Sequence, residues 1–463
     1  MGVLVNTLTQ LNGWFKELYA DQELNLVPEA TYLVKNVKFN KSQQGTGNVY
    51  HQPVWLTQEQ GFTYAAAGIQ GGATPGAFAL NSAVPALMQD AQITGTQLVL
   101  RSQIDYETLA RAANTKASFG EMSKVLVENM TQAMAKRLEI MFLYGRSPSG
   151  IGVISAGTVG SAGVDATLTV TAATWAPGLW AGMEGAAISL NVLTGTYPSQ
   201  QQTRRQAAAA TTNGGIIRSI NYSTRVLSVS DTFAAAASAA IFVTPTAGDV
   251  IFLFGTIANA AGPATIVYND SIGLDGICTQ SSGSLFNINL ATYSLFASNL
   301  ASLIGSALTV TNLLQNLLPA IGKGLMDDLT VLVSHEAYMG LVNPTIDPVG
   351  QAGSTNVKTG ANVMLQRSDE LRFGARKVTI VGHTGEIEIV PHLFVKRNDI
   401  FCLPKKLGAP LRVGATDVTF QTPGKGGEFF LHLPSNAGYE VRCYSNQALF
   451  TPAPGRLTKM TLT

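Results

Sequence analysis

Histidines, cysteines and paired charged residues are the side chains of this sequence that could do chemistry. The five histidines are dispersed along the chain: His51, His335, His383, His392 and His432. Only His335 is followed directly by a carboxylate residue, Glu336. After His335-Glu336, Met339 occupies the position where the helix of a zinc protease carries its second histidine. We interpret His335 and Glu336 as the beginning of a helix, and the sequence predicts no metal site.

Other charged pairs also lack the neighbours that catalysis or phosphate binding would need. Gly322-Lys323 and Gly424-Lys425 are each followed by glycine, whereas a Walker A loop needs Ser or Thr at that point. We interpret Asp327-Asp328 as loop carboxylates that can cap an element, and Arg204-Arg205 as part of an exposed loop. No GxSxG motif is present. We therefore predict no catalytic residues, no cofactor and no enzyme activity.

The three cysteines are Cys278, Cys402 and Cys443. They are odd in number, far apart and contain no CxxC motif, so neither a disulfide framework nor a structural zinc site is expected. Free thiols of this kind are typical of a reducing cytosol. The sequence assigns them no other role.

The composition points to association rather than to binding of a charged partner. Only 13% of the 463 residues are charged, the formal net charge is +1, and 46 residues are glycine. About a quarter of the residues are charged in an ordinary domain, and a surface with few charges promotes association. Burial of much of the surface against other copies would explain this composition, and a sequence-specific nucleic-acid binder is not indicated.

Neither secretion nor a membrane anchor is expected. The first residues lack the basic and apolar regions of a signal peptide. The stretch from Gly276 to Gly322 carries no charge, but polar residues such as Gln280, Asn299 and Asn312 interrupt it. A membrane span needs about 20 mainly apolar residues, so we predict a buried stretch instead.

The strongest structural signal is one long helix from Phe119 to Tyr144. Ser118 and Glu121 have the spacing of a capping box at its start, and Gly145 can end it in the left-handed conformation. An apolar stripe with helical spacing follows one face, formed by Met122, Leu126, Met130, Met134, Leu138 and Met141. Lys136 and Glu139 lie mostly off this stripe. When this pattern is considered alone, it is that of an ordinary core helix in a large domain.

A predicted two-stranded ribbon precedes the helix. Strands are indicated at 49–56 and 92–100, and the segment between them is rich in Gly, Ala and Pro. This segment is too long for a tight hairpin turn, so it is either a flexible excursion or a projecting ribbon that reaches another chain. Residues 1–48 look like an arm with a short amphipathic helix, which could pack on its own domain or on a neighbour.

After the helix, the predicted elements change from strands to mixed structure and back. Residues 165–262 contain five short β-branched runs separated by turn signals, which indicates a small β-barrel or sandwich. Residues 272–375 alternate between helix and strand, with Thr309 and Ser334 as helix caps. From 376 onward the chain reads as strands, with a hairpin around His383-Thr384-Gly385.

This order of parts resembles the major capsid proteins of tailed bacteriophages, which have the Hong Kong 97 shell fold. Residues 136–155 look like the end of that family's spine helix and the following strand. Residues 175–190, 214–230, 248–255 and 272–277 look like the β insertion that some members carry before the axial domain, and 438–462 resembles the closing strands. The resemblance implies an α+β fold with these units: 1–48 N-terminal arm; 49–104 extended loop; 105–160 spine helix and first part of the peripheral domain; 161–265 inserted β-rich, barrel-like domain; 266–375 axial domain; 376–463 peripheral-domain strands.

The resemblance also implies a function. It predicts a virion protein, assembled in the host cytoplasm, that forms hexamers and pentamers of a phage head around double-stranded DNA. Implied partners are a portal protein and, in some members, scaffolding or decoration proteins; no membrane is involved. Some relatives join subunits covalently through a lysine in the extended loop, but no lysine occurs between Lys41 and Lys116. The arm begins almost at Met1, so we expect no large processed segment.

Contacts between subunits are expected from the arm and the ribbon. The candidate contact residues are Trp14, Phe15, Trp55, Phe62, Tyr64, Gly71, Gly72, Pro75 and Phe78, while the apolar stripe listed above packs the spine helix. Two alternatives remain open at this point. One is the shell of an encapsulin-type nanocompartment, and the other is an enzyme with a β-rich domain.

Overall fold

The computed structural model describes residues 27, 31–40, 49–64, 79–105, 107, 122–207, 214–258, 264–303, 308–339, 363–365, 378–382, 385–421, 430–433 and 438–462. Several sequence predictions lie outside these residues. They are the arm helix, the capping box of Ser118 and Glu121, and the candidate contact residues Trp14, Phe15, Gly71, Gly72, Pro75 and Phe78.

The long helix is present as α3 (Met122–Tyr144). Its last seven residues, Leu138 to Tyr144, are all enclosed by the surrounding elements. Glu139 was expected off the apolar stripe, but its side chain is 0% exposed. Neighbours on all sides of this part, rather than on one stripe, indicate that the end of the helix lies inside the core.

The helix ends differently from the prediction. Arg146, not Gly145, has the left-handed conformation, with φ 51°. Glycine is needed at 145 for close approach, since a Cβ there would lie 2.1 Å from the carbonyl oxygen of Ser271. The chain before α5 (Leu274–Thr279) is thus held directly against the end of α3.

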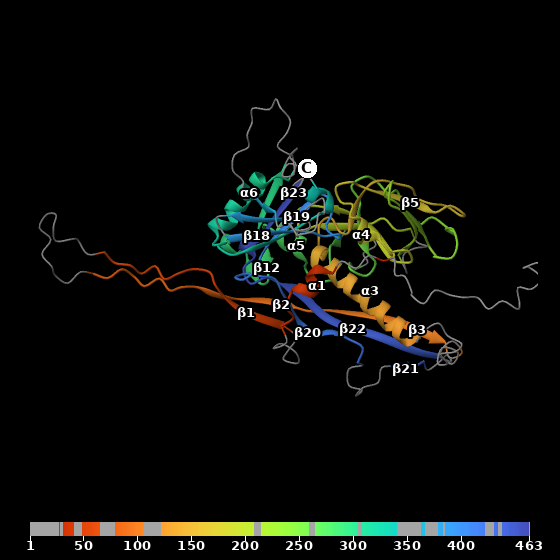
Figure 1. Ribbon diagram of the computed structural model, residues 1–463, viewed down its shortest axis with the longest axis horizontal. Helices are drawn as coiled ribbons and strands as arrows, with labels where there is room; N and C mark the ends of the chain where they lie inside the picture. Colours follow the sequence, from red (N-terminus) through yellow and green to blue (C-terminus); the bar gives the residue numbers. More distant parts are fainter. Residues whose placement is uncertain are drawn as a thin grey trace, which may run out of the picture.

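A long antiparallel sheet lies alongside α3 (Figure 1). Its central strand is β22 (Gly438–Phe450), which pairs with β3 (Thr96–Asp105) along ten residues. β20 (Leu411–Thr419) pairs with the same strand, as does β21 (Phe430–His432). The short α1 (Tyr32–Asn36) packs against α3 and contributes Leu33, which is 0% exposed.

The predicted ribbon is present as β1 (Val49–Trp55) and β2 (Met88–Thr94), which are antiparallel. Pairing continues beyond both strands, because the N–H of Gln60 donates to the carbonyl of Val84 at 3.0 Å. We expected one returning strand at 92–100, but residues of this segment belong to two strands, β2 and β3. Figure 1 shows the ribbon projecting away from the body of the molecule.

The five predicted β runs form strands of an antiparallel barrel. Six strands close a ring, because β10 pairs with both β4 and β6. The ring order is β10 (Val250–Leu253), β4 (Gly152–Gly157), β5 (Ala166–Val170), β9 (Val226–Ser230), β8 (Gly215–Asn221) and β6 (Ala187–Thr194), with β7 (Gln201–Arg204) and β11 (Ala264–Thr265) continuing from β6. The strand after the spine helix, β4, therefore belongs to this barrel. The short α4 (Pro177–Trp180) contributes Trp180 to the shared core.

A mixed seven-stranded sheet forms the third layer. Its order is β14 (Asn299–Leu303), β23 (Thr458–Leu462), β19 (Asp399–Pro404), β15 (Leu329–Val333), β18 (Gly385–Pro391), β17 (Val378–Gly382) and β16 (Val363–Leu365). The helix α6 (Val310–Gly322) covers it, and the side chain of Thr309 caps this helix as predicted. The strands from 376 onward were placed in one closing unit, but the structure divides them between this sheet and the long sheet.

Smaller elements join the layers. They are the hairpin β12 (Ser284–Leu285) and β13 (Ile288–Asn289), and the 3-10 turns η4 (Ser294–Phe296) and η5 (Pro454–Arg456). The hairpin touches the base of the ribbon, since the N–H of Gln92 donates to the carbonyl of Phe286 at 3.0 Å. The predicted hairpin around residue 383 is also present, as the antiparallel pair β17 and β18.

Candidate functional site

The projecting ribbon exposes large apolar side chains along its whole described length. Trp55 is 66% exposed, Phe62 65% and Tyr64 90%. On the returning side, Leu80 and Val84 are exposed as well. Exposed large apolar side chains gathered on one segment are typical of an interaction site, and these side chains lack cover from the part of the chain that the structure describes.

Few charged side chains accompany this apolar surface. His51 and Asp90 lie across the ribbon, with Nδ1 and Oδ2 2.5 Å apart, and this contact lowers the pKa of Asp90. Glu59 is exposed at the outer part of the ribbon. Among the described residues between 49 and 94, these are the two carboxylates, and Asp90 already has a partner. The surface is therefore mainly apolar, with one accessible negative charge.

The spine helix anchors the beginning of the described chain through Glu139. Its carboxylate accepts hydrogen bonds from the backbone N–H groups of Leu33 and Val34 at 2.8 and 2.9 Å, and from Nε2 of His392 at 3.1 Å. Nδ1 of His392 accepts from the N–H of Phe394, so the ring proton lies on Nε2. Three segments, α1, α3 and the turn at 391–398, thus meet at one buried carboxylate.

A second buried group of charges lies beyond the end of the helix. Nζ of Lys459 contacts Asp275 and lies 3.1 Å from Oδ1 of Asp399. Burial alone would raise the pKa of Asp275, but the adjacent Lys459 and Lys396 hold it below its usual value. Lys396 donates to Oγ of Ser149 at 2.7 Å, and burial lowers its pKa to about 8. Two lysines and two aspartates balance each other here, as buried charges require.

These two clusters have a structural role that sequence reasoning missed. Each cluster joins segments that are more than a hundred residues apart in the sequence, such as Glu139 with His392 and Asp275 with Lys459, and no short motif brings them together. One signal was available: Glu139 directly precedes the unbroken apolar run Ile140 to Tyr144. A charged residue within a run buried on all sides needs internal partners.

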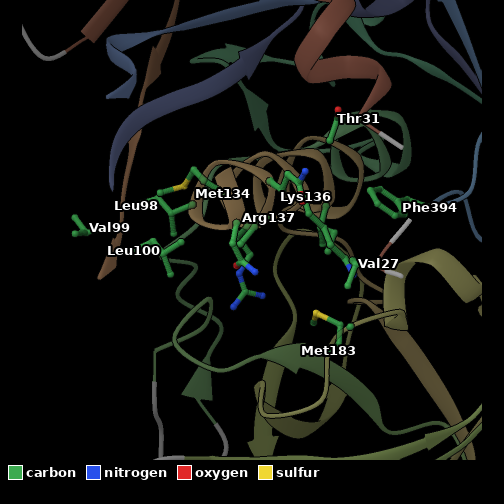
Figure 2. A pocket seen from close by; sticks show the side chains of 15 residues that line it. Val27, Thr31, Leu98, Val99, Leu100, Met134, Lys136, Arg137, Met183 and Phe394 are labelled. Atoms are coloured by element: carbon green, nitrogen blue, oxygen red, sulfur yellow. The ribbon is translucent and has the colours of Figure 1, made fainter. Parts of the chain in front are cut away.

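Figure 2 shows a pocket between α3, β3 and the segment around Met183. Its volume is about 410 Å³, and Leu98, Leu100 and Met183 are among its lining residues. Arg137 extends from the helix into this space, and its Nη1 atom is enclosed without a hydrogen-bond acceptor among the described residues. Lys136 differs, because its Nζ donates to the carbonyl of Ala181.

The predicted packing residues of the spine helix lie in the core in most cases. Met130, Met134, Leu138 and Met141 are buried, and Leu126 is partly buried; the side chain of Met122 lies outside the described part. The charged pairs considered for chemistry are used internally. Oδ1 of Asp328 accepts from the N–H of Glu386 at 3.0 Å, and Arg205 pairs with Asp249 at 3.2 Å. The second glycine-lysine pair, at 424–425, lies outside the described residues.

The three cysteines are free and buried. Burial raises the pKa of Cys402 to about 12 and that of Cys443 to about 11, so both are protonated thiols at neutral pH. Within the described ranges, we find no group of three or more His, Cys, Asp or Glu side chains placed to hold a metal ion. None of the helices described is long and apolar enough to cross a membrane.

Comparison with solved structures identifies the fold. The capsid protein of cyanophage A-1(L) superposes with a TM-score of 0.52 at 9% sequence identity, covering 98% of this chain and 99% of that one. A capsid protein of a native GTA particle covers 100% of both chains at 7% identity, with a TM-score of 0.46. The SrpI encapsulin of Synechococcus elongatus covers 99% of this chain and 96% of its own at 8% identity, with a TM-score of 0.42.

No protein-family model and no curated protein matches the sequence. The assignment therefore depends on three-dimensional structure, and on the cyanophage superposition in particular. The chain has the Hong Kong 97 shell fold of tailed-phage major capsid proteins, with the α+β architecture that the sequence resemblance predicted.

Proposed function

We propose that this protein is a major capsid protein that assembles into hexamers and pentamers of a phage head. The observation that carries the proposal is the superposition over 98% of the chain on a cyanophage capsid protein. A ribbon that projects from the body and exposes Trp55, Phe62 and Tyr64 supports it. In a closed shell, each such ribbon lies on an adjacent copy, and symmetry repeats the contact at every subunit.

The functional units follow from this proposal. Residues 49–104 act as the extended loop, α3 as the spine, and 161–265 as an inserted β-rich domain. The long sheet takes the place of the peripheral domain and the seven-stranded sheet that of the axial domain. Residues 1–48 act as an arm. The role is non-catalytic: subunits supply surface and rigidity, and neither a cofactor nor a metal is required.

The proposed content of the shell is double-stranded DNA, held without sequence-specific binding. The net charge of +1 supports this, because each additional phosphate contact would add a salt-dependent affinity between wall and genome. A portal protein is an expected partner at one vertex, together with scaffolding or decoration proteins if the head needs them. The place of action is the virion, after assembly in the cytoplasm of the host.

Electron microscopy of purified protein tests the proposal. Shells, or hexameric and pentameric rings, are expected, whereas a small soluble oligomer would contradict it. Nuclease treatment of particles from infected cells then tests the content. Protected double-stranded DNA supports a phage head, and a protein cargo without DNA would identify a nanocompartment instead. Because lysine is missing from 42–115, denaturing gels should show monomers and no ladder of covalent multimers through the ribbon.

A further inference from the structure

The pocket beside the spine helix contains a positive charge without a carboxylate partner among the described residues. Arg137 enters the pocket from α3, and burial lowers the pKa of this guanidinium. Its Nη1 atom is enclosed and has no acceptor among the described residues. Lys136, the adjacent cation, is satisfied by the carbonyl of Ala181 and lies near Glu184. An enclosed guanidinium nitrogen without an acceptor is costly, so within the described residues this site lacks a hydrogen-bond acceptor.

The walls of the pocket indicate the chemistry of the missing group. Leu98 and Leu100 from β3, Met134 from α3 and Met183 from the barrel side give it apolar surfaces around the guanidinium (Figure 2). Its volume of about 410 Å³ is in the range of pockets that enclose a ligand-sized group. The matching group carries a carboxylate, which can bind a guanidinium with two parallel hydrogen bonds, next to apolar side chains.

The ribbon has this combination. Glu59 is exposed and follows Trp55 closely, and Phe62 comes shortly after it. No ion pair of Glu59 is found in the part of the chain that the structure describes, whereas the other ribbon carboxylate, Asp90, faces His51. Within the described residues, one chain therefore carries a carboxylate without an ion pair on the projecting ribbon, and a guanidinium nitrogen without an acceptor in a pocket with apolar walls.

We propose that Glu59 of one subunit binds Arg137 in the pocket of an adjacent copy of this chain. This inference rests on the proposed shell function and specifies which residues join two subunits. The pair fixes the register of the ribbon, because apolar side chains alone allow it to slide, whereas a bidentate ion pair defines one position. The contact also completes the unsatisfied guanidinium only after assembly, so it favours assembled over free subunits.

Charge exchange tests the pair. Arg137→Glu and Glu59→Arg should each raise the protein concentration needed for assembly at least tenfold, because like charges then meet in a desolvated site. The double variant should assemble within about threefold of wild type. Gln60→Arg is the matched control: it places an arginine one residue further along the ribbon, keeps Glu59, and should have little effect. Circular dichroism of each variant establishes that the subunits are folded.

Mixing the two single variants distinguishes contacts between copies from contacts within one chain. If Glu59 reaches an adjacent copy, alternating subunits restore matched charges and the mixture assembles better than either variant alone. Rescue in the double variant without rescue in the mixture would place the pair within one chain and overturn the proposal. Normal assembly of both folded single variants, or failure of the double variant to improve on them, would overturn it as well.

Cross-linking detects the contact between subunits even if closed shells do not form. In Arg137→Lys protein, a carbodiimide should couple the carboxylate of Glu59 to the new amine. Mixed light and heavy isotope-labelled subunits should then yield peptides joined between copies. A coupled peptide in small oligomers, without shells, would support the contact while contradicting the proposed function. Shells without any such peptide and without a charge-exchange effect would retain the function and exclude the contact.

Discussion

Replacing Glu139 by glutamine should detach the beginning of the described chain from the spine helix. The carboxylate accepts three N–H groups, two from the backbone of α1 and one from His392. Glutamine has nearly the same shape, but it keeps only one acceptor oxygen and presents an NH₂ group to donors. At least one hydrogen bond to a charged group is lost, about 1.5–3 kcal/mol, and one buried donor is left unsatisfied, about 1–3 kcal/mol.

We therefore expect a loss of about 2.5–6 kcal/mol in the free energy of unfolding at this junction. Two measurements check it: the urea midpoint of the subunit, and hydrogen exchange at the amides of Leu33 and Val34. Exchange there should accelerate by at least about 60-fold, since every 1.4 kcal/mol is a factor of ten. Glu128→Gln is the matched control, because Glu128 lies on the same helix and is exposed. Unchanged protection at both amides would refute the reasoning, since it would mean that the carboxylate does not hold α1.

Three further perturbations have defined outcomes. Leu138→Lys places a charge at a position with 0% exposure and should give insoluble or unassembled protein, measured by sedimentation and microscopy. Val125→Lys, on the exposed face of the same helix, should leave assembly unchanged. Normal shells from the Leu138→Lys protein would contradict the spine role. Gly145→Ala introduces a Cβ 2.1 Å from the carbonyl oxygen of Ser271 and should cost at least about 1–3 kcal/mol by overpacking, measured against Gly322→Ala, where space is open. Burial raises the pKa of Asp270 from 3.8 to about 7. Between these two pH values, the folded state keeps a proton that the unfolded chain releases. The free energy of unfolding should therefore fall by up to about 4 kcal/mol as the pH rises from 4 to 7. Asp270→Asn should flatten this dependence in urea titrations at several pH values, and an unchanged slope would show that another group is responsible.

Elements defined by local signals could be predicted from the sequence. The ribbon strands, the spine helix and the cap at Thr309 each depend on a few neighbouring residues, and each is present. The barrel was predictable as a set of β runs, because β-branched residues between turn signals form strands in most surroundings. Its closure was not predictable, since it depends on β10 pairing with β4 and β6 at once.

The missed features arise where distant segments meet. The helical pattern showed only that Glu139 lies off the apolar stripe, because its partners, Leu33 and His392, lie more than a hundred residues away in both directions. The strands after 376 looked like one unit because local patterns carry no information on which sheet a strand joins. The same limit applies to Arg137, whose significance comes from the pocket around it rather than from its neighbours in the sequence.

The pairing of β3 with β22 has a consequence for how the subunit is made. Thr96 pairs with Gln447 and Asp105 with Gly438. The pairing of β3 therefore cannot form until β22, which lies hundreds of residues later in the chain, has been synthesised. At about 5–20 residues per second, this delay lasts tens of seconds on the ribosome. β23, later still in the chain, completes the seven-stranded sheet between β14 and β19. A nascent chain therefore cannot complete either sheet until nearly all of its residues have been synthesised.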